Sequence, residues 1–242
     1  MKRELKKQIK EDEFLSGVGL AWKWLRENEK LARVVLVATV LVLVAVAGLS
    51  YFTGKRERGA AEAFDAAMRI YETPLAAELP GPPPSGVVPF KEASEKFTKA
   101  AAAFDGVERS YPSQLAGRRA RYYAALCRIE LGDLTGARQA LEALAGSGGL
   151  EASLAKLSLA GLDRRAGAVD KAVESYRSLA EDASFALPRD YVLMTLAHTL
   201  EEARRTQEAV VSYQSLYERY PESSYAAEAQ QRAAYLRGRA KG

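Results

Sequence analysis

The segment LGDLTGARQALEAL, residues 131–144, carries the pattern that decides the fold of most of the chain. Gly132 is followed five residues later by Ala137, and Leu141 and Leu144 lie four and seven residues beyond that alanine. Residues at these spacings share one face of an α-helix, so the small alanine lets a neighbouring helix approach while the larger side chains fill the space beside it. The segment therefore predicts a turn followed by a closely packed helix.

The same phrase occurs four times. It consists of alanine, an aromatic residue or leucine four positions later, and valine or leucine three positions after that. The copies are Ala100/Phe104/Val107, Ala137/Leu141/Leu144, Ala172/Tyr176/Leu179 and Ala209/Tyr213/Leu216. Successive alanines are 37, 35 and 37 residues apart. A period of this length is typical of stacked helical hairpins. No segment predicts a strand, so the expected fold is all-α.

Turn signals stand at matching places in the copies. Gly167 precedes Ala172 as Gly132 precedes Ala137, whereas the last copy has Arg204-Arg205-Thr206 at that place, without glycine. Tyr111-Pro112-Ser113 and Tyr220-Pro221-Glu222-Ser223 predict points where proline stops one helix and serine caps the next.

Residues 90–236 resemble the tetratricopeptide repeat. The resemblance lies in the order of four features: small residues in a first helix, a glycine before the second helix, the alanine and aromatic pattern, and a later proline. The aromatic residue and Leu-Gly pair usual in the first helix are not intact, so the copies are degenerate. The resemblance implies an α-solenoid whose first helices line a concave groove that binds other proteins. The implied groove residues are Arg119, Tyr122, Leu126, Glu130, Leu157, Arg164, Arg165, Tyr191, Met194, His198 and Glu201. An alternative for any of these side chains is that it only bridges neighbouring helices.

Before the repeats lies the uncharged run VVLVATVLVLVAVAGLSYF, from Val34 to Phe52. As a helix with a rise of about 1.5 Å per residue it is long enough to cross the roughly 30 Å apolar core of a bilayer. We therefore predict a transmembrane helix over residues 34–54 that contacts lipid. The alternatives are a buried core helix and a signal peptide cleaved after Ala47, since Ala45-Val46-Ala47 has the small-x-small form of a cleavage site.

The segment before this run, residues 1–33, is basic and then amphipathic, with Trp22 and Trp24 suited to a membrane interface or to docking on a membrane partner. A tail that only fixes topology is an equal alternative. Its net charge is +3, and the residues after the run carry only +1. By the positive-inside rule we expect the N-terminus in the cytoplasm and the C-terminal part on the extracytoplasmic side of a bacterial inner membrane.

The C-terminal part, residues 55–242, begins with an alanine-rich stretch, residues 55–77, that predicts a helix weakened or ended at Pro74. The proline-rich residues 78–89 then predict an extended loop between two helices of one hairpin. The layout of tail, span and degenerate repeats is similar to that of the YfgM family of ancillary Sec translocon subunits. The Tyr-Pro-x-Ser-x-x-Ala phrase at 220–226 also resembles envelope repeat proteins of the BamD and CpoB kind.

The chain offers little for catalysis or metal binding. His198 is its only histidine and Cys127, among apolar residues, its only cysteine. Neither a metal site nor a nucleophilic pair can be built from them with any redundancy, and no glycine-rich phosphate loop follows a strand. We expect no cofactor, no metal and no enzyme activity, although a hydrolase or transferase remains the alternative of another class. The nearly neutral repeat region also gives no electrostatic footprint for nucleic acid.

These observations predict a membrane-anchored scaffold that binds other proteins. The resemblance implies translocon subunits, chaperones or exported chains as partners. An adaptor in cell-envelope assembly or division is the alternative.

Overall fold

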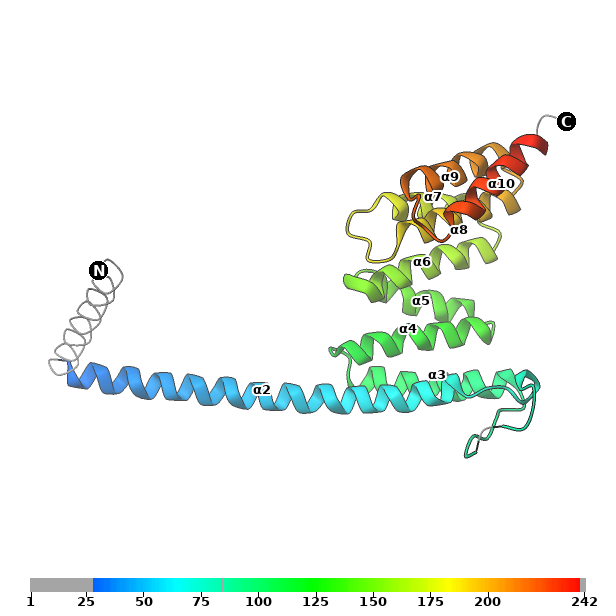
Figure 1. Cartoon of the computed structure of the whole chain (residues 1–242). Helices are drawn as coiled ribbons and strands as arrows, with labels where there is room; N and C mark the ends of the chain where they lie inside the picture. Colours follow the sequence, from blue (N-terminus) through cyan, green and yellow to red (C-terminus); the bar gives the residue numbers. More distant parts are fainter. Residues whose placement is uncertain (1–27, 84, 240–242) are drawn as a thin grey trace, which may run out of the picture. The chain divides into compact units, whose positions relative to one another are not determined.

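The computed structural model describes residues 28–83 and 85–239, and in this part of the chain it is all-α, as the repeat pattern predicted (Figure 1). The tail with Trp22 and Trp24 lies outside the described residues. The α-helices are α2 (Glu29–Glu72), α3 (Ala93–Ser110), α4 (Leu115–Glu130), α5 (Leu134–Ala145), α6 (Gly149–Arg165), α7 (Val169–Glu181), α8 (Arg189–Glu202), α9 (Thr206–Arg219) and α10 (Ala226–Arg239), with a short 3₁₀ helix, η1 (Ala76–Glu78).

Helix α2 runs without a break through the apolar segment and ends at Glu72, just before Pro74. The chain divides into two compact units between Arg56 and Glu57, inside this helix. In the first unit the large apolar side chains of α2 are exposed to between 49% and 71%. No core therefore covers the apolar segment in the described chain.

The second unit is a stack of helical hairpins, in which helices consecutive in sequence from α3 to α10 contact one another (Figure 1). Helices α4, α6 and α8 are the first helices of their hairpins, and α5, α7 and α9 are the second helices. The four alanines of the repeated phrase, Ala100, Ala137, Ala172 and Ala209, are all fully buried. The phrase thus marks close helix packing, as its spacing predicted.

Residues 57–72 of α2 complete the first hairpin with α3. Phe64 and Tyr71 of α2 pack with Phe97 and Phe104 of α3 and with Tyr123 of α4. The Phe104 and Tyr123 rings stack with centroids 5.3 Å apart. The buried residues of α2 are Ala60 and Ala67, so alanine also allows close packing here, and the aromatic side chains fill the space beside it.

The turns inside the hairpins share one geometry. Gly132, Gly167 and Arg204 adopt positive φ angles of 80°, 78° and 59°. In each turn the next residue donates a backbone hydrogen bond back into the first helix, as in Asp133 N to Arg128 O at 2.9 Å and Arg205 N to Leu200 O at 2.8 Å. This helix ending favours glycine, so Arg204 holds a conformation that costs more for a residue with a β-carbon.

The proline-rich connection between α2 and α3 is closed at its base by an isolated bridge between Leu75 and Phe90. Ala76 N donates to Phe90 O at 2.8 Å, and Phe90 N donates to Pro74 O at 3.1 Å. The two ends of this loop are therefore tied together before α3 begins.

The expectation that serine caps the helices after the Tyr-Pro turns is wrong at Ser113. The residue preceding α4 is Gln114, and its side chain makes no capping hydrogen bond. The Ser113 carbonyl oxygen instead accepts from Arg118 Nη1 at 3.3 Å. At the second turn Ser223 Oγ accepts from Tyr225 N at 3.1 Å, but Tyr225 precedes α10, so this bond closes the turn before the helix and does not cap a helical N–H group.

Candidate protein-binding groove

The first helices of the hairpins line one face of the stack, since α4 contacts α6 directly as well as its own partner α5. In repeat stacks such a face forms an extended binding surface. We call the surface formed by α4, α6 and α8 the groove. All the groove residues predicted from the sequence lie on these three helices.

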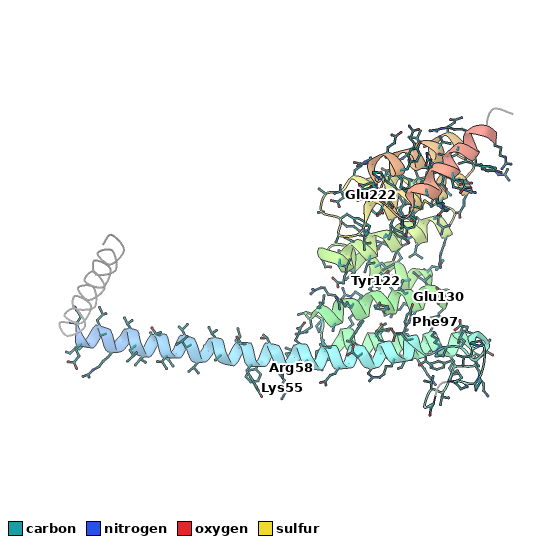
Figure 2. All side chains as sticks on the ribbon, in the orientation of Figure 1. Lys55, Arg58, Phe97, Tyr122, Glu130 and Glu222 are labelled. Atoms are coloured by element: carbon teal, nitrogen blue, oxygen red, sulfur yellow. The ribbon has the colours of Figure 1, made fainter. Side chains whose placement is uncertain are left out.

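Between α4 and α6 the groove is bridged by two polar contacts. Arg119 Nε donates to Glu151 Oε1 at 3.2 Å, and the carboxylate-bearing side chain is almost fully buried. The hydroxyl oxygens of Tyr122 and Ser158 lie 3.3 Å apart. Figure 2 labels Tyr122 on α4, in the middle of the stack. Arg119 and Tyr122 therefore hold neighbouring hairpins together.

Burial raises the pKa of the Tyr122 hydroxyl, and the hydroxyls of Tyr123 and Tyr191 act in the same direction, while the Ser158 contact opposes them. Tyr191 is on α8, two first helices away along the stack. The Tyr191 side chain itself is 43% exposed, and its ring centroid is 6.2 Å from that of Tyr225.

Between α6 and α8 the groove deepens into a pocket of about 170 Å³. Arg164 Nη1 donates to Glu202 Oε2 at 2.8 Å across one side of it. The pocket is lined by Arg164, Met194, Thr195, His198, Thr199 and Glu202. Met194 is largely buried and the other lining residues are polar or charged, so the pocket presents mainly hydrogen-bonding groups.

Beyond α8 the groove meets α10. The Tyr213 hydroxyl of α9 donates to Glu201 Oε2 at 2.8 Å, and Arg232 of α10 also donates to the Glu201 carboxylate. Burial, with the Glu201 contact in support, raises the pKa of Tyr213. His198 Nε2 is 3.7 Å from Glu228 Oε1 of α10. His198 and Glu201 are thus tied to the helix that ends the described stack.

The remaining predicted residues divide by exposure. Leu126 and Leu157 are half-buried, and Leu157 packs against the core. Glu130 and Arg165, at the ends of α4 and α6, are exposed and make no ion pair with the described residues. The structure therefore brings Arg164, Met194 and His198 into one pocket, whereas Glu130 and Arg165 lie at the rim.

Sequence reasoning missed several residues that complete the groove: Glu151, Ser158, Thr195, Glu202 and Tyr225. The sequence separation between partners could have identified some of these residues. The bridging partners Tyr122 and Ser158 are 36 residues apart, and Arg164 and Glu202 are 38 apart, which is close to the repeat period. Complementary polar residues one period apart on first helices are the pattern that would have found them.

A second pocket, of about 410 Å³, lies between α5, α6 and α7, outside the groove. Two of its basic residues lie around the buried Asp163 carboxylate, which accepts from Arg138 Nη2 at 2.7 Å and lies 3.2 Å from Lys171 Nζ. This carboxylate therefore joins the three helices, α5 through Arg138, α6 through Asp163 itself and α7 through Lys171.

The described residues contain no cluster of three or more histidine, cysteine or acidic side chains able to hold a metal ion. Cys127 is fully buried in α4, and burial raises the pKa of its thiol to about 12. A thiol in that state is a poor nucleophile near neutral pH, because the thiolate is the reactive form.

The sequence matches the tetratricopeptide repeat-like domain family over residues 22–192, well over half of the chain. The chain belongs to this family. A second match, to the tetratricopeptide repeat, covers residues 191–223, which form the α8–α9 hairpin. No curated protein matches the sequence. Tetratricopeptide repeats serve as protein-interaction scaffolds and are typically non-enzymatic. The family match also begins before the apolar run, so it covers the α2–α3 hairpin that the alanine-rich stretch and the proline-rich loop predicted.

Proposed function

We propose that this protein is a single-pass membrane scaffold that holds its repeat stack beside a membrane and binds other proteins in the groove. The observation that carries this proposal is the apolar segment of α2. Its most apolar 18-residue window has a mean hydropathy of 2.6, and none of it is buried within the protein. Exposed apolar surface of that extent is costly in water and favourable in a bilayer.

The proposed arrangement has a cytoplasmic tail over residues 1–33, a span over 34–54 and an extracytoplasmic repeat region over 55–242, with its proline-rich loop at 78–89. The excess of basic residues before the span supports this orientation in a bacterial inner membrane. The similarity to the YfgM family suggests the Sec translocon, envelope chaperones or exported chains as partners. Tethering raises the effective concentration of a weak groove near such partners.

Cell fractionation of the full chain tests the anchor. We expect the protein to stay in the membrane pellet after alkaline carbonate extraction. Its intact mass should include residues 34–54, and N-terminal sequencing should find no chain that begins at Gly48. A reporter fused after residue 239 tests orientation, since it should be active only outside the cytoplasm. Recovery of a soluble form that begins at Gly48 would show a cleaved signal peptide and contradict the anchor.

A further inference from the structure

We propose that Lys55 and Arg56 form a binding site for anionic phospholipid headgroups at the C-terminal end of the span. This inference rests on the proposed membrane anchor and goes beyond it, because it assigns a lipid class and two residues. Two observations on this end of the apolar segment carry it: the aromatic residues that precede the pair, and the lack of a carboxylate at interacting helical spacings.

The aromatic residues fix the depth of the pair. Tyr51 and Phe52 are exposed to 69% and 67%, and their rings pack edge to face with centroids 6.0 Å apart. Aromatic side chains at the end of an apolar helix lie at headgroup level. Lys55 follows Phe52 by three residues, or about 4.5 Å of helix rise. Its ammonium group and the Arg56 guanidinium therefore reach the layer that contains the lipid phosphates.

Helix geometry leaves the pair without a carboxylate at an interacting spacing, since Glu57 follows Arg56 directly and points to another side of the helix. Side chains interact along a helix at spacings of three and four residues. At those spacings Lys55 meets Tyr51, Phe52, Arg58 and Gly59, and Arg56 meets Phe52, Thr53, Gly59 and Ala60, so no carboxylate is available. Neither residue forms an ion pair anywhere in the described part of the chain, and both are exposed.

The N-terminal end of the described span carries Lys30 and Arg33. Arg33 is paired with Glu29, four residues earlier on the same helix, whereas Lys30 is exposed. The charges of Lys55 and Arg56 have no carboxylate partner at helical spacing, so both remain available to a lipid phosphate.

The chemistry of the two side chains selects the lipid. A lysine ammonium binds a phosphate as a point charge, and an arginine guanidinium can donate two parallel hydrogen bonds to phosphate oxygens. In phosphatidylcholine the phosphate charge is balanced by the lipid's own quaternary ammonium group, whereas phosphatidylglycerol carries a net negative charge. The pair should therefore prefer phosphatidylglycerol.

Quenching of tryptophan fluorescence by brominated lipids tests this preference on the full chain in bilayers. Phe52→Trp supplies a reporter at the site, in a background with Trp22→Phe and Trp24→Phe. Bilayers contain either brominated phosphatidylglycerol or brominated phosphatidylcholine mixed with unbrominated phosphatidylcholine. We expect the anionic lipid to associate at the reporter about fivefold more strongly, and the preference to fall to about one in K55Q/R56Q.

The matched control is K91Q/R109Q, which removes the same charge from two exposed residues with no ion pair among the described residues. It should retain the full preference. Equal association of the two lipids with the parent protein, or a preference that survives in K55Q/R56Q, would overturn the lipid site while leaving the span intact. Absence of quenching by both lipids would place the reporter outside the bilayer and overturn the proposed anchor as well.

Discussion

Gly117 of α4 lies so close to the backbone of Tyr111 that a β-carbon built on it would be 1.9 Å from the Tyr111 carbonyl oxygen. The contact joins the start of α4 to the Tyr-Pro turn that follows α3. No side chain can be accommodated there unless the backbone of the turn moves. The identity of residue 117 thus fixes how the first two hairpins meet.

Gly117→Ala should lower the free energy of unfolding by about 1–3 kcal/mol, because the added methyl group overpacks a backbone contact. Urea denaturation of the repeat stack in the full chain, followed by circular dichroism, measures the change. Gly106→Ala is the matched control. Gly106 is in the interior of α3 with open space around its β-carbon position, so the substitution should stabilise the helix by about 1 kcal/mol. Equal effects of the two substitutions would show that the close contact at Gly117 does not exist.

Arg204→Gly should stabilise the fold by about 0.5–1 kcal/mol, because glycine adopts the positive φ of this turn without steric cost. The equivalent Gly132→Ala and Gly167→Ala should destabilise it by about 1 kcal/mol. Arg204→Ala separates the backbone effect from the loss of the arginine side chain, and it should leave stability near that of the parent. A destabilising Arg204→Gly would mean that the arginine side chain contributes more than its backbone conformation costs.

The stability of the α7–α9 junction should depend on pH through Glu208. Hydrogen bonds from Arg205, at 2.7 Å, and from Arg177, at 2.5 Å, lower the pKa of this carboxyl from 4.5 to about 2. A lowered pKa means that the carboxylate stabilises the folded state above about pH 4.5 and that this contribution is lost as the pH falls toward 2. Thermal unfolding midpoints between pH 6 and pH 2 should therefore fall less steeply in Glu208→Gln.

Glu142→Gln is the control for that experiment, since Glu142 is exposed and makes no ion pair with the described residues. Its pH profile should follow that of the parent protein. Superimposable profiles for the parent and Glu208→Gln would argue against the hydrogen bonds from the two arginines.

Cys127 should react with an alkylating reagent only when the fold opens. Its burial and its pKa of about 12 keep the thiol protonated and covered at pH 8. In native buffer we expect modification at least a hundredfold slower than in urea, measured by the mass added by iodoacetamide. Rapid modification of the native protein would show that the α3–α4 core opens readily, so that Cys127 is accessible to the reagent.

Much of the fold could be predicted from the sequence because the repeated phrase combines a small residue, two larger apolar residues and a turn signal at one period. These features act locally and recur, so the buried alanines and the turns at Gly132 and Gly167 follow from spacing alone. The turn at Arg204 could be placed only by its position in the period, since its residue type gives no turn signal. The α2–α3 hairpin was predicted from other signals, an alanine-rich stretch ended by Pro74 and a proline-rich loop, because α2 lacks the repeated phrase.

The groove was predictable in position but not in detail. Spacing on a first helix indicates which residues share a face, and the resemblance to tetratricopeptide repeats supplied which face that is. Whether a side chain remains available depends on the neighbouring hairpin. Arg119 and Arg164 are engaged by Glu151 and Glu202 from the next first helix, and such pairs between repeats become visible only in three dimensions.

Site-specific photocrosslinking in intact membranes tests the central claim, that the groove binds other proteins beside the membrane. A photoreactive residue at Tyr191 or Tyr122 probes the groove, and one at Val211, 65% exposed on the second helix α9, is the control outside it. The account predicts discrete protein adducts from both groove positions and few from Val211, with translocon subunits, chaperones or exported chains identified by mass spectrometry. Adducts with envelope-assembly or division proteins instead would support a scaffold that acts in that pathway. Adducts from Val211 but from neither groove position would contradict the account.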